Sequence, residues 1–137
     1  MFAKGTCLES NLSKNCWQLE QGVKLLALSN IKAGDTVLDL SCGTGELSLE
    51  IAKMVGPFGR VIGVESDKDL CEIAKAAIPE SVKNVTIIGT SFENLNVIDD
   101  ASIDVVFCNY VLHWVSNKYN LLNELHRCLR PGGWIVM

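Results

Sequence analysis

The sequence predicts an α/β fold, in which helices alternate with the strands of one doubly wound parallel sheet. Short apolar runs rich in β-branched residues alternate with amphipathic stretches from residue 36 to the end of the chain. The first run has apolar residues on both faces, as expected for a strand that helices cover on both sides. The connections are short, so the crossovers are expected to be right-handed and the strands parallel.

The leading segment, residues 1–30, is predicted to form a helix over residues 11–29. Apolar residues recur there at helical spacing, namely Cys16, Leu19, Val23, Leu26 and Ala27. The turn KAGD then precedes the first strand, TVLDL, at residues 36–40. This strand opens the alternating core, residues 31–137.

The next elements follow from their start and stop signals. A helix over residues 46–55 is stopped by Gly56 and Pro57 and leads into a second strand, RVIGVE, at residues 60–65. A helix over residues 68–77, opened by the capping signals Ser66 and Asp67, precedes a third strand, NVTIIG, at residues 84–89. These elements place two further strands beside the first.

The last elements repeat the same alternation. The run SIDVVFCNY, residues 102–110, is a predicted fourth strand, and a leucine stripe over residues 121–129 marks a helix that ends at RPGG. WIVM, from residue 134, begins a fifth strand. No repeat, linker or low-complexity segment interrupts the pattern, so residues 1–137 are predicted to form a single domain.

Composition narrows the functional classes. The chain has 137 residues, of which 48% are hydrophobic, and 12 basic against 16 acidic residues give a net charge of −4. The basic residues are scattered, which argues against a nucleic-acid partner. Six cysteines without a CxxC pair or a nearby His argue for free thiols and against a metal site. The absence of a leader and of a run long enough to span a membrane favours a cytoplasmic protein without a membrane partner.

The stretch VLDLSCGTGELSLEIA, from residue 37, joins the first strand to a helix through Gly43 and Gly45. In a doubly wound sheet, ligands bind at such carboxyl ends of strands. A dinucleotide fingerprint would need a third glycine, where Ser48 stands. Asp39 would also repel a pyrophosphate at the helix N-terminus and suits a cationic ligand better. A nicotinamide-dependent oxidoreductase is therefore the disfavoured alternative.

LDLSCGTGELS resembles the first motif of class I S-adenosylmethionine-dependent methyltransferases, an acidic residue followed by a G-x-G turn. VIGVES, GTSFENL, DVVFCNYVLHWV and LHRCLRPGGWIVM resemble later segments of that family. The resemblance covers the chain from about residue 16. It implies a Rossmann-like three-layer sandwich with strand order 3-2-1-4-5, lacking the last two strands of the family, and S-adenosylmethionine as the cofactor, with S-adenosylhomocysteine as its product.

The resemblance also implies a set of cofactor-binding residues. Its members are Asp39 near the ammonium group, Ser41, Gly43 and Gly45 in the turn, Glu65 and Ser66 at the ribose, Thr90, Ser91 and Phe92 at the adenine, and Asn109 near the methionine part. For Asp39 the structural alternative is a polar residue that caps the turn. For Glu65 it is ordinary solvation at a helix entry.

The acceptor side is predicted from the segment after the fourth strand. His113 could act as the catalytic base or orient a substrate, with structural packing against Trp114 as the alternative. Trp17, Tyr110 and Trp114 could wall the acceptor pocket or fill the core. The function predicted first is methyl transfer to a small-molecule acceptor. A cofactor-binding module without catalysis is the second reading.

Two positions depart from the family pattern. Ser41 stands where the family commonly has Gly, which matters only if this residue must take a positive φ. Thr90 stands where an acid often receives the adenine amino group. The chain also stops after the fifth strand, so that strand is expected to be an exposed edge through which a homodimer could form.

Overall fold

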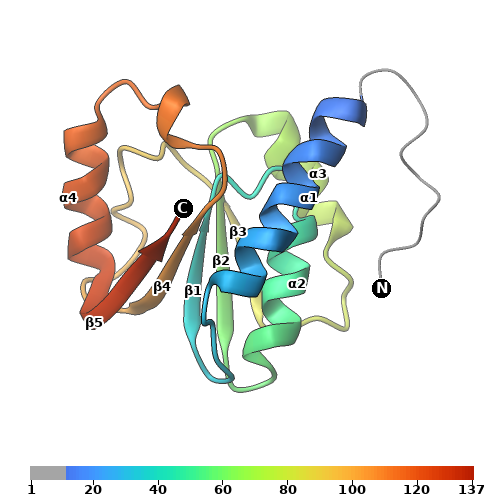
Figure 1. Ribbon diagram of the computed structural model, residues 1–137, viewed down its shortest axis with the longest axis horizontal. Coiled ribbons are helices and arrows are strands. Elements are labelled where there is room, and N and C mark those ends of the chain that lie inside the picture. Colours follow the sequence, from blue (N-terminus) through green and yellow to red (C-terminus); the bar gives the residue numbers. More distant parts are fainter. Residues whose placement is uncertain (1–11) are drawn as a thin grey trace.

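Five parallel strands form one sheet in the order β3-β2-β1-β4-β5 in the computed structural model, which describes residues 12–137 (Figure 1). This order confirms the predicted α/β fold. The elements are α1 (Leu12–Leu28), β1 (Thr36–Leu40), α2 (Glu46–Val55), β2 (Arg60–Glu65), α3 (Lys68–Ala77), β3 (Val85–Gly89), β4 (Ile103–Cys108), the 3₁₀ turn η1 (Leu112–Trp114), α4 (Lys118–Cys128) and β5 (Leu129–Val136). The part of the predicted leading segment before residue 12 lies outside the described residues.

Helices cover both faces of the sheet, with α1, α2 and α3 on one face and α4 on the other (Figure 1). Each face has its own apolar core. Val37 and Phe107 pack with Ile51 of α2 and Leu26 of α1, whereas Leu38, Leu40 and Val106 pack with Leu121 and Leu125 of α4. Because successive residues of a strand point to opposite faces, Asp39 faces α2 on the same side as Val37.

The strand register brings the carboxyl ends of the three central strands together. Leu40 at the end of β1 pairs with Val64 of β2 and with Cys108 of β4. The carboxyl ends of these strands therefore carry, side by side, Ser41, Glu65 and Asn109. A doubly wound sheet binds its ligands at these strand ends.

The predicted capping signal of α3 is confirmed. The Asp67 carboxylate accepts hydrogen bonds from the backbone N–H groups of Asp69 and Leu70, at 2.9 and 3.0 Å. These bonds satisfy two of the donors that a helix leaves unpaired at its N-terminus. The cap fixes where the chain turns after Glu65, the last residue of β2.

The end of the chain differs from the prediction. The sequence predicts that the last helix ends in a turn at RPGG and that the strand begins at residue 134, but β5 begins at Leu129. Ile103 pairs with Leu129, and Val105 already pairs with Trp134, so the intervening residues bulge out of the ladder. Pro131 lacks an N–H for the ladder, and Gly132, with φ +85°, allows the bend.

Cys42, Cys71, Cys108 and Cys128 are free and buried, as predicted. The prediction is wrong for Cys16, which is disulfide-bonded, and Cys7 lies outside the described residues. Within residues 12–137, no helix combines the length and the apolar character needed to cross a membrane.

Candidate cofactor site

The turn after β1 is built from left-handed residues. Ser41, Gly43 and Gly45 have φ values of +63°, +57° and +90°. The N–H of Gly45 donates to the carbonyl of Cys42 at 2.9 Å, which closes the turn at the start of α2. A Cβ atom at Gly43 would meet no other atom within 4 Å. The backbone at Gly43 is therefore open to a ligand that approaches closely.

Asp39 is a buried carboxylate with one hydrogen-bond partner. Its side chain is 2% exposed, and its Oδ2 accepts a hydrogen bond of 2.5 Å from the hydroxyl of Ser48 on α2. Burial raises the pKa of Asp39 to about 6, the Ser48 hydroxyl opposes this rise, and the nearby charge of Glu65 adds to it. Asp39 is thus partly protonated near pH 6 and charged at pH 7.

Glu65 holds the turn and the start of α3 together. Its Oε2 accepts from the N–H of Gly43 at 3.0 Å, and its Oε1 accepts from Ser66 and Asp67 at 2.8 and 3.0 Å. A carboxylate has about four lone-pair positions, so these three bonds leave about one for a ligand hydroxyl. Ser66, predicted at the ribose, contacts Glu65 through its backbone.

The segment predicted at the adenine lies directly after β3. Thr90 is tied to Glu65, because its N–H donates to the Glu65 carbonyl at 3.1 Å, and its hydroxyl donates to Asn94. The Ser91 hydroxyl accepts from the N–H of Glu93. Phe92 is partly buried against the core cluster on the α4 face. The segment therefore adjoins the site, while these side chains already have protein partners.

Asn109 connects the end of β4 to α1. Its side-chain amide donates to the carbonyl of Gln18 at 3.0 Å. Gly22 allows this close approach, since a Cβ there would lie 2.4 Å from Leu47 Cδ1 and 2.9 Å from Asn109 Nδ2. The side-chain amide of Asn109, which was predicted near the methionine part together with the backbone as the alternative, is thus bonded to α1. The backbone of Asn109 remains at the edge of the site.

The aromatic residues predicted on the acceptor side form a chain of ring contacts. The ring centroids of Trp17 and Tyr110 lie 5.0 Å apart, those of Tyr110 and His113 6.5 Å, and those of His113 and Trp114 4.9 Å. Trp17, Tyr110 and Trp114 are 51%, 41% and 73% exposed, so they do not fill the core. Tyr110 has φ +59°, a strained conformation for a residue with a large side chain.

A cavity of about 520 Å³ opens beside this chain of rings. Tyr110 and His113 line it, whereas Trp17 and Trp114 contact those two residues without lining it. Gln21 and Lys24 of α1 contribute polar groups, and the other lining residues are mostly apolar. Neither Gln21 nor Lys24 was predicted from the sequence to line the site. Helical spacing from Trp17 would have placed Gln21 on the same face of α1.

Ser48 is the other residue that sequence reasoning did not assign to the site. In the sequence Ser48 stands where a dinucleotide fingerprint would need its third glycine, and in the structure its hydroxyl is the hydrogen-bond partner of Asp39. The sequence signal for this contact was the position of Ser48 in the first turn of the helix that follows Asp39. Among the described residues, no group of three His, Cys, Asp or Glu side chains could hold a metal ion.

Two buried carboxylates, Asp39 and Glu65, lie beside the turn after β1. Of the four polar residues that are buried in the described chain, Asp39, Ser48 and Glu65 all lie here. In that part of the chain neither carboxylate forms an ion pair. Buried charges are normally paired, so this arrangement favours a ligand with a positive charge. Fold and site together define an α/β protein in which the buried carboxylates at the carboxyl ends of β1 and β2 suit a cationic, hydroxyl-bearing ligand.

Comparison with known proteins identifies the family. Residues 38–137 match a family described as a methyltransferase domain. The demethylmenaquinone methyltransferase of Lactococcus lactis is 36% identical over 104 residues, which cover 75% of this chain and 41% of that protein. The 2-phytyl-1,4-naphtoquinone methyltransferase of Nostoc punctiforme is 38% identical over 105 residues, which cover 76% of this chain and 46% of that protein. The chain therefore belongs to the class I S-adenosylmethionine-dependent methyltransferases.

Solved structures agree with this assignment. A methyltransferase of Aquifex aeolicus superimposes with a TM-score of 0.74 and 27% identity, covering 80% of this chain and 58% of that one. An arsenic(III) S-adenosylmethionine methyltransferase of Chlamydomonas reinhardtii superimposes with a TM-score of 0.71 and 32% identity, covering 77% of this chain and 38% of that one. The matching segments cover less than half the length of each of the two quinone methyltransferases.

Proposed function

We propose that this chain binds S-adenosylmethionine at the carboxyl ends of β1 and β2 and takes part in methyl transfer to a small acceptor. The observation that supports this most is the pair of buried carboxylates, Asp39 and Glu65, without a cationic partner beside the left-handed turn. The family relationship supports the same cofactor.

Each part of the cofactor has a chemically matching group. Asp39 would attract the ammonium group, and the open backbone at Gly43 would admit the methionine part. Glu65 has about one free lone pair for a ribose hydroxyl while it keeps its three amide partners. A second ribose hydroxyl would have to share an oxygen with, or displace, one of those amides. The segment from Thr90 to Phe92 would adjoin the adenine.

The acceptor is proposed to be a small planar molecule in the cavity beside Tyr110 and His113. The mostly apolar lining and the exposed rings suit a planar, apolar acceptor. The names of two relatives, which refer to menaquinone and naphthoquinone compounds, point in the same direction. Trp17 and Trp114 would support the rings that line the cavity.

The chemistry requires little from the protein. When bound, the cofactor supplies a methyl group on a positively charged sulfur, which keeps the electron pair of the broken bond. The chain's residues would hold the acceptor in line with that methyl group and exclude water. For an acceptor that carries a proton at its nucleophilic atom, His113 would receive that proton.

Thermal unfolding tests the proposal, since a ligand that binds only the folded state raises its stability. S-adenosylmethionine and S-adenosylhomocysteine are expected to raise the melting temperature, and NAD is not. Glu65→Gln should weaken this effect, and Glu72→Gln, at an exposed ion pair on α3, should not. The absence of any shift with either adenosyl compound would refute cofactor binding. A radiolabelled methyl assay with a naphthoquinol acceptor then separates an active enzyme from a binding module.

A further inference from the structure

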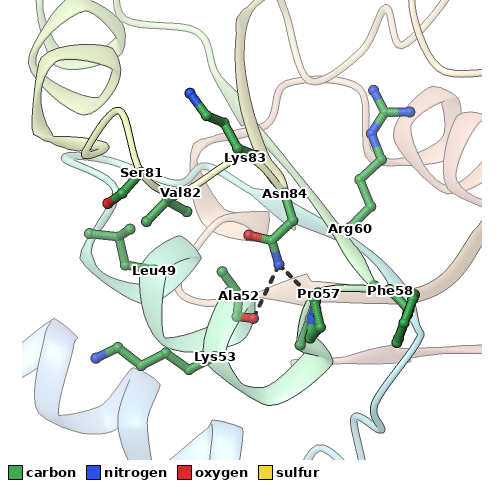
Figure 2. A pocket seen from close by; sticks show the side chains of 12 residues that line it. Leu49, Ala52, Lys53, Pro57, Phe58, Arg60, Ser81, Val82, Lys83 and Asn84 are labelled. Atoms are coloured by element: carbon green, nitrogen blue, oxygen red, sulfur yellow. Dashed lines mark hydrogen bonds between the residues drawn. The ribbon is translucent and has the colours of Figure 1, made fainter.

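A second cavity lies away from the candidate cofactor site. Its volume is about 780 Å³, and Figure 2 shows the side chains that line it. They come from the end of α2, the turn 56–59, the start of β2 and the segment 81–84 before β3. Because these are the amino ends of β2 and β3, the cavity stands at the opposite edge of the sheet from Asp39 and Glu65. The proposed function does not use it.

The floor of this cavity is apolar, and two backbone carbonyls beside it accept hydrogen bonds from a side chain. Leu49, Ala52, Pro57 and Val82 supply the apolar surface. The side-chain amide of Asn84 donates to the carbonyls of Ala52 and Gly56, at 3.3 and 2.9 Å (Figure 2). Asn84 thus caps carbonyl groups at the C-terminus of α2, which would otherwise make the floor electronegative.

The charged residues that line the cavity all have the same sign. They are Lys53, Arg60 and Lys83, and no Asp or Glu is among the lining residues. Lys53 is neutralised by Glu50, 2.6 Å away. In the part of the chain that the structure describes, Arg60 and Lys83 have no ion-pair partner. This local concentration of positive charge contrasts with the net charge of the whole chain, which is −4.

The sheet register places Arg60 and Lys83 near the starts of two neighbouring strands. Val61 pairs with Val85, so Arg60 stands beside Asn84, the residue that follows Lys83. The N–H of Val61 donates to the Asn84 carbonyl at 2.8 Å, which fixes this position. Both side chains extend away from α2 in Figure 2. Two cations therefore stand at neighbouring strand starts, next to an apolar floor.

Phe58 indicates what kind of ligand fits. Its side chain lines the cavity and is 95% exposed at the tip of the turn between α2 and β2. A pocket for a small molecule encloses most of its ligand, whereas an aromatic side chain that projects outward beside a groove is typical of a protein interface. The two unpaired cations require an acidic partner for charge complementarity.

We propose that this cavity is a docking site for an acidic segment of a partner protein. An apolar side chain of that segment packs on the floor and against Phe58, and its carboxylates pair with Arg60 and Lys83. The site is separate from the methyl-transfer site, and the partner is held at the opposite edge of the sheet.

NMR titration tests this directly. The ¹⁵N-labelled chain is mixed with a pool of short peptides in which Asp and Glu alternate with Leu and Phe, and with a matched pool that carries Asn and Gln instead. The acidic pool is expected to shift the amides of the turn 56–59 and of residues 81–84, and the neutral pool is not. Arg60→Glu with Lys83→Glu should weaken binding at least about tenfold, since two ion pairs become repulsive.

The control variant carries the same change in charge elsewhere. Lys68→Glu with Lys118→Glu alters two exposed lysines that begin α3 and α4 at the opposite edge of the sheet. This variant should bind the acidic pool as the native chain does, and Phe58→Ala should bind it more weakly. No shift with the acidic pool, or equal weakening by the control variant, overturns the proposal. Binding through Arg60 and Lys83 to phosphatidylglycerol vesicles, without peptide binding, also overturns it in favour of a membrane contact.

Discussion

Replacement of Asp39 by Asn should make the chain's stability less dependent on pH. Asp39 is buried, and its pKa is raised from 3.8 to about 6, mainly by desolvation. A carboxyl whose pKa is higher in the folded state binds more protons when folded. Its contribution to stability is therefore largest at low pH and is lost as the pH rises through about 6. Asn keeps the shape and has no such titration.

The size of the effect follows from the two pKa values. A rise of about two units corresponds to about 3 kcal/mol between the fully protonated and the fully charged limits. Between pH 8 and pH 5 about half of this, roughly 1.4 kcal/mol, is gained, because pH 5 lies about one unit below the raised pKa. For a domain of this size, that is a change of about 5 °C in melting temperature.

Urea unfolding of the native chain and of Asp39→Asn at pH 5 and pH 8 provides the measurement. The variant's stability relative to the native chain should be greater at pH 8 than at pH 5 by about 1.4 kcal/mol. The hydrogen-bonding cost of the Asn side chain is the same at both pH values, so it cancels when the relative stability at pH 5 is subtracted from that at pH 8. A relative stability that does not change between the two pH values would refute the burial argument. Ser48→Ala, which removes the hydroxyl donor, should raise the pKa of Asp39 further.

Two further predictions concern backbone positions. Ser41→Gly should stabilise the chain by about 0.5–1 kcal/mol in urea unfolding. The variant relieves the strain of a left-handed serine, about 1–2 kcal/mol, and this gain exceeds the added entropy cost of glycine. A destabilised variant would contradict this prediction. Gly22→Ala, which would normally favour a helix by up to about 1 kcal/mol, should instead destabilise by about 1–3 kcal/mol because its Cβ would overlap Leu47. A more stable Gly22→Ala chain would show that α1 is not held in this close contact.

Much of the fold could be predicted because its signals are local. The strand TVLDL and the helix after it are flanked by glycine and proline signals, and the structure reproduces both ranges. These ranges needed only periodicity and the geometry of parallel sheets. The placement of Asp39 and Glu65 in one site was implied by the family resemblance, and it agrees with the rule that parallel strands end at the same side of a sheet.

The remainder depends on contacts between distant residues. The start of β5 at Leu129 is decided by pairing with Ile103, which local signals at RPGG do not reveal. The bond from the Asn109 amide to the carbonyl of Gln18 joins residues that are ninety-one positions apart in the sequence, so no local signal reveals it. The positive φ of Ser41 depends on how the whole turn closes. The cavity beside Arg60 and Lys83 forms only when α2, β2 and the start of β3 come together.

The most direct test of cofactor binding is an NMR titration of the ¹⁵N-labelled chain with S-adenosylhomocysteine. Saturable binding should shift the amides of Gly43, Gly45, Ser66 and Thr90, which surround the two buried carboxylates, and leave that of Asn84 at the opposite edge unchanged. Shifts confined to other parts of the chain, or none at millimolar ligand, would contradict cofactor binding at the carboxyl ends of β1 and β2.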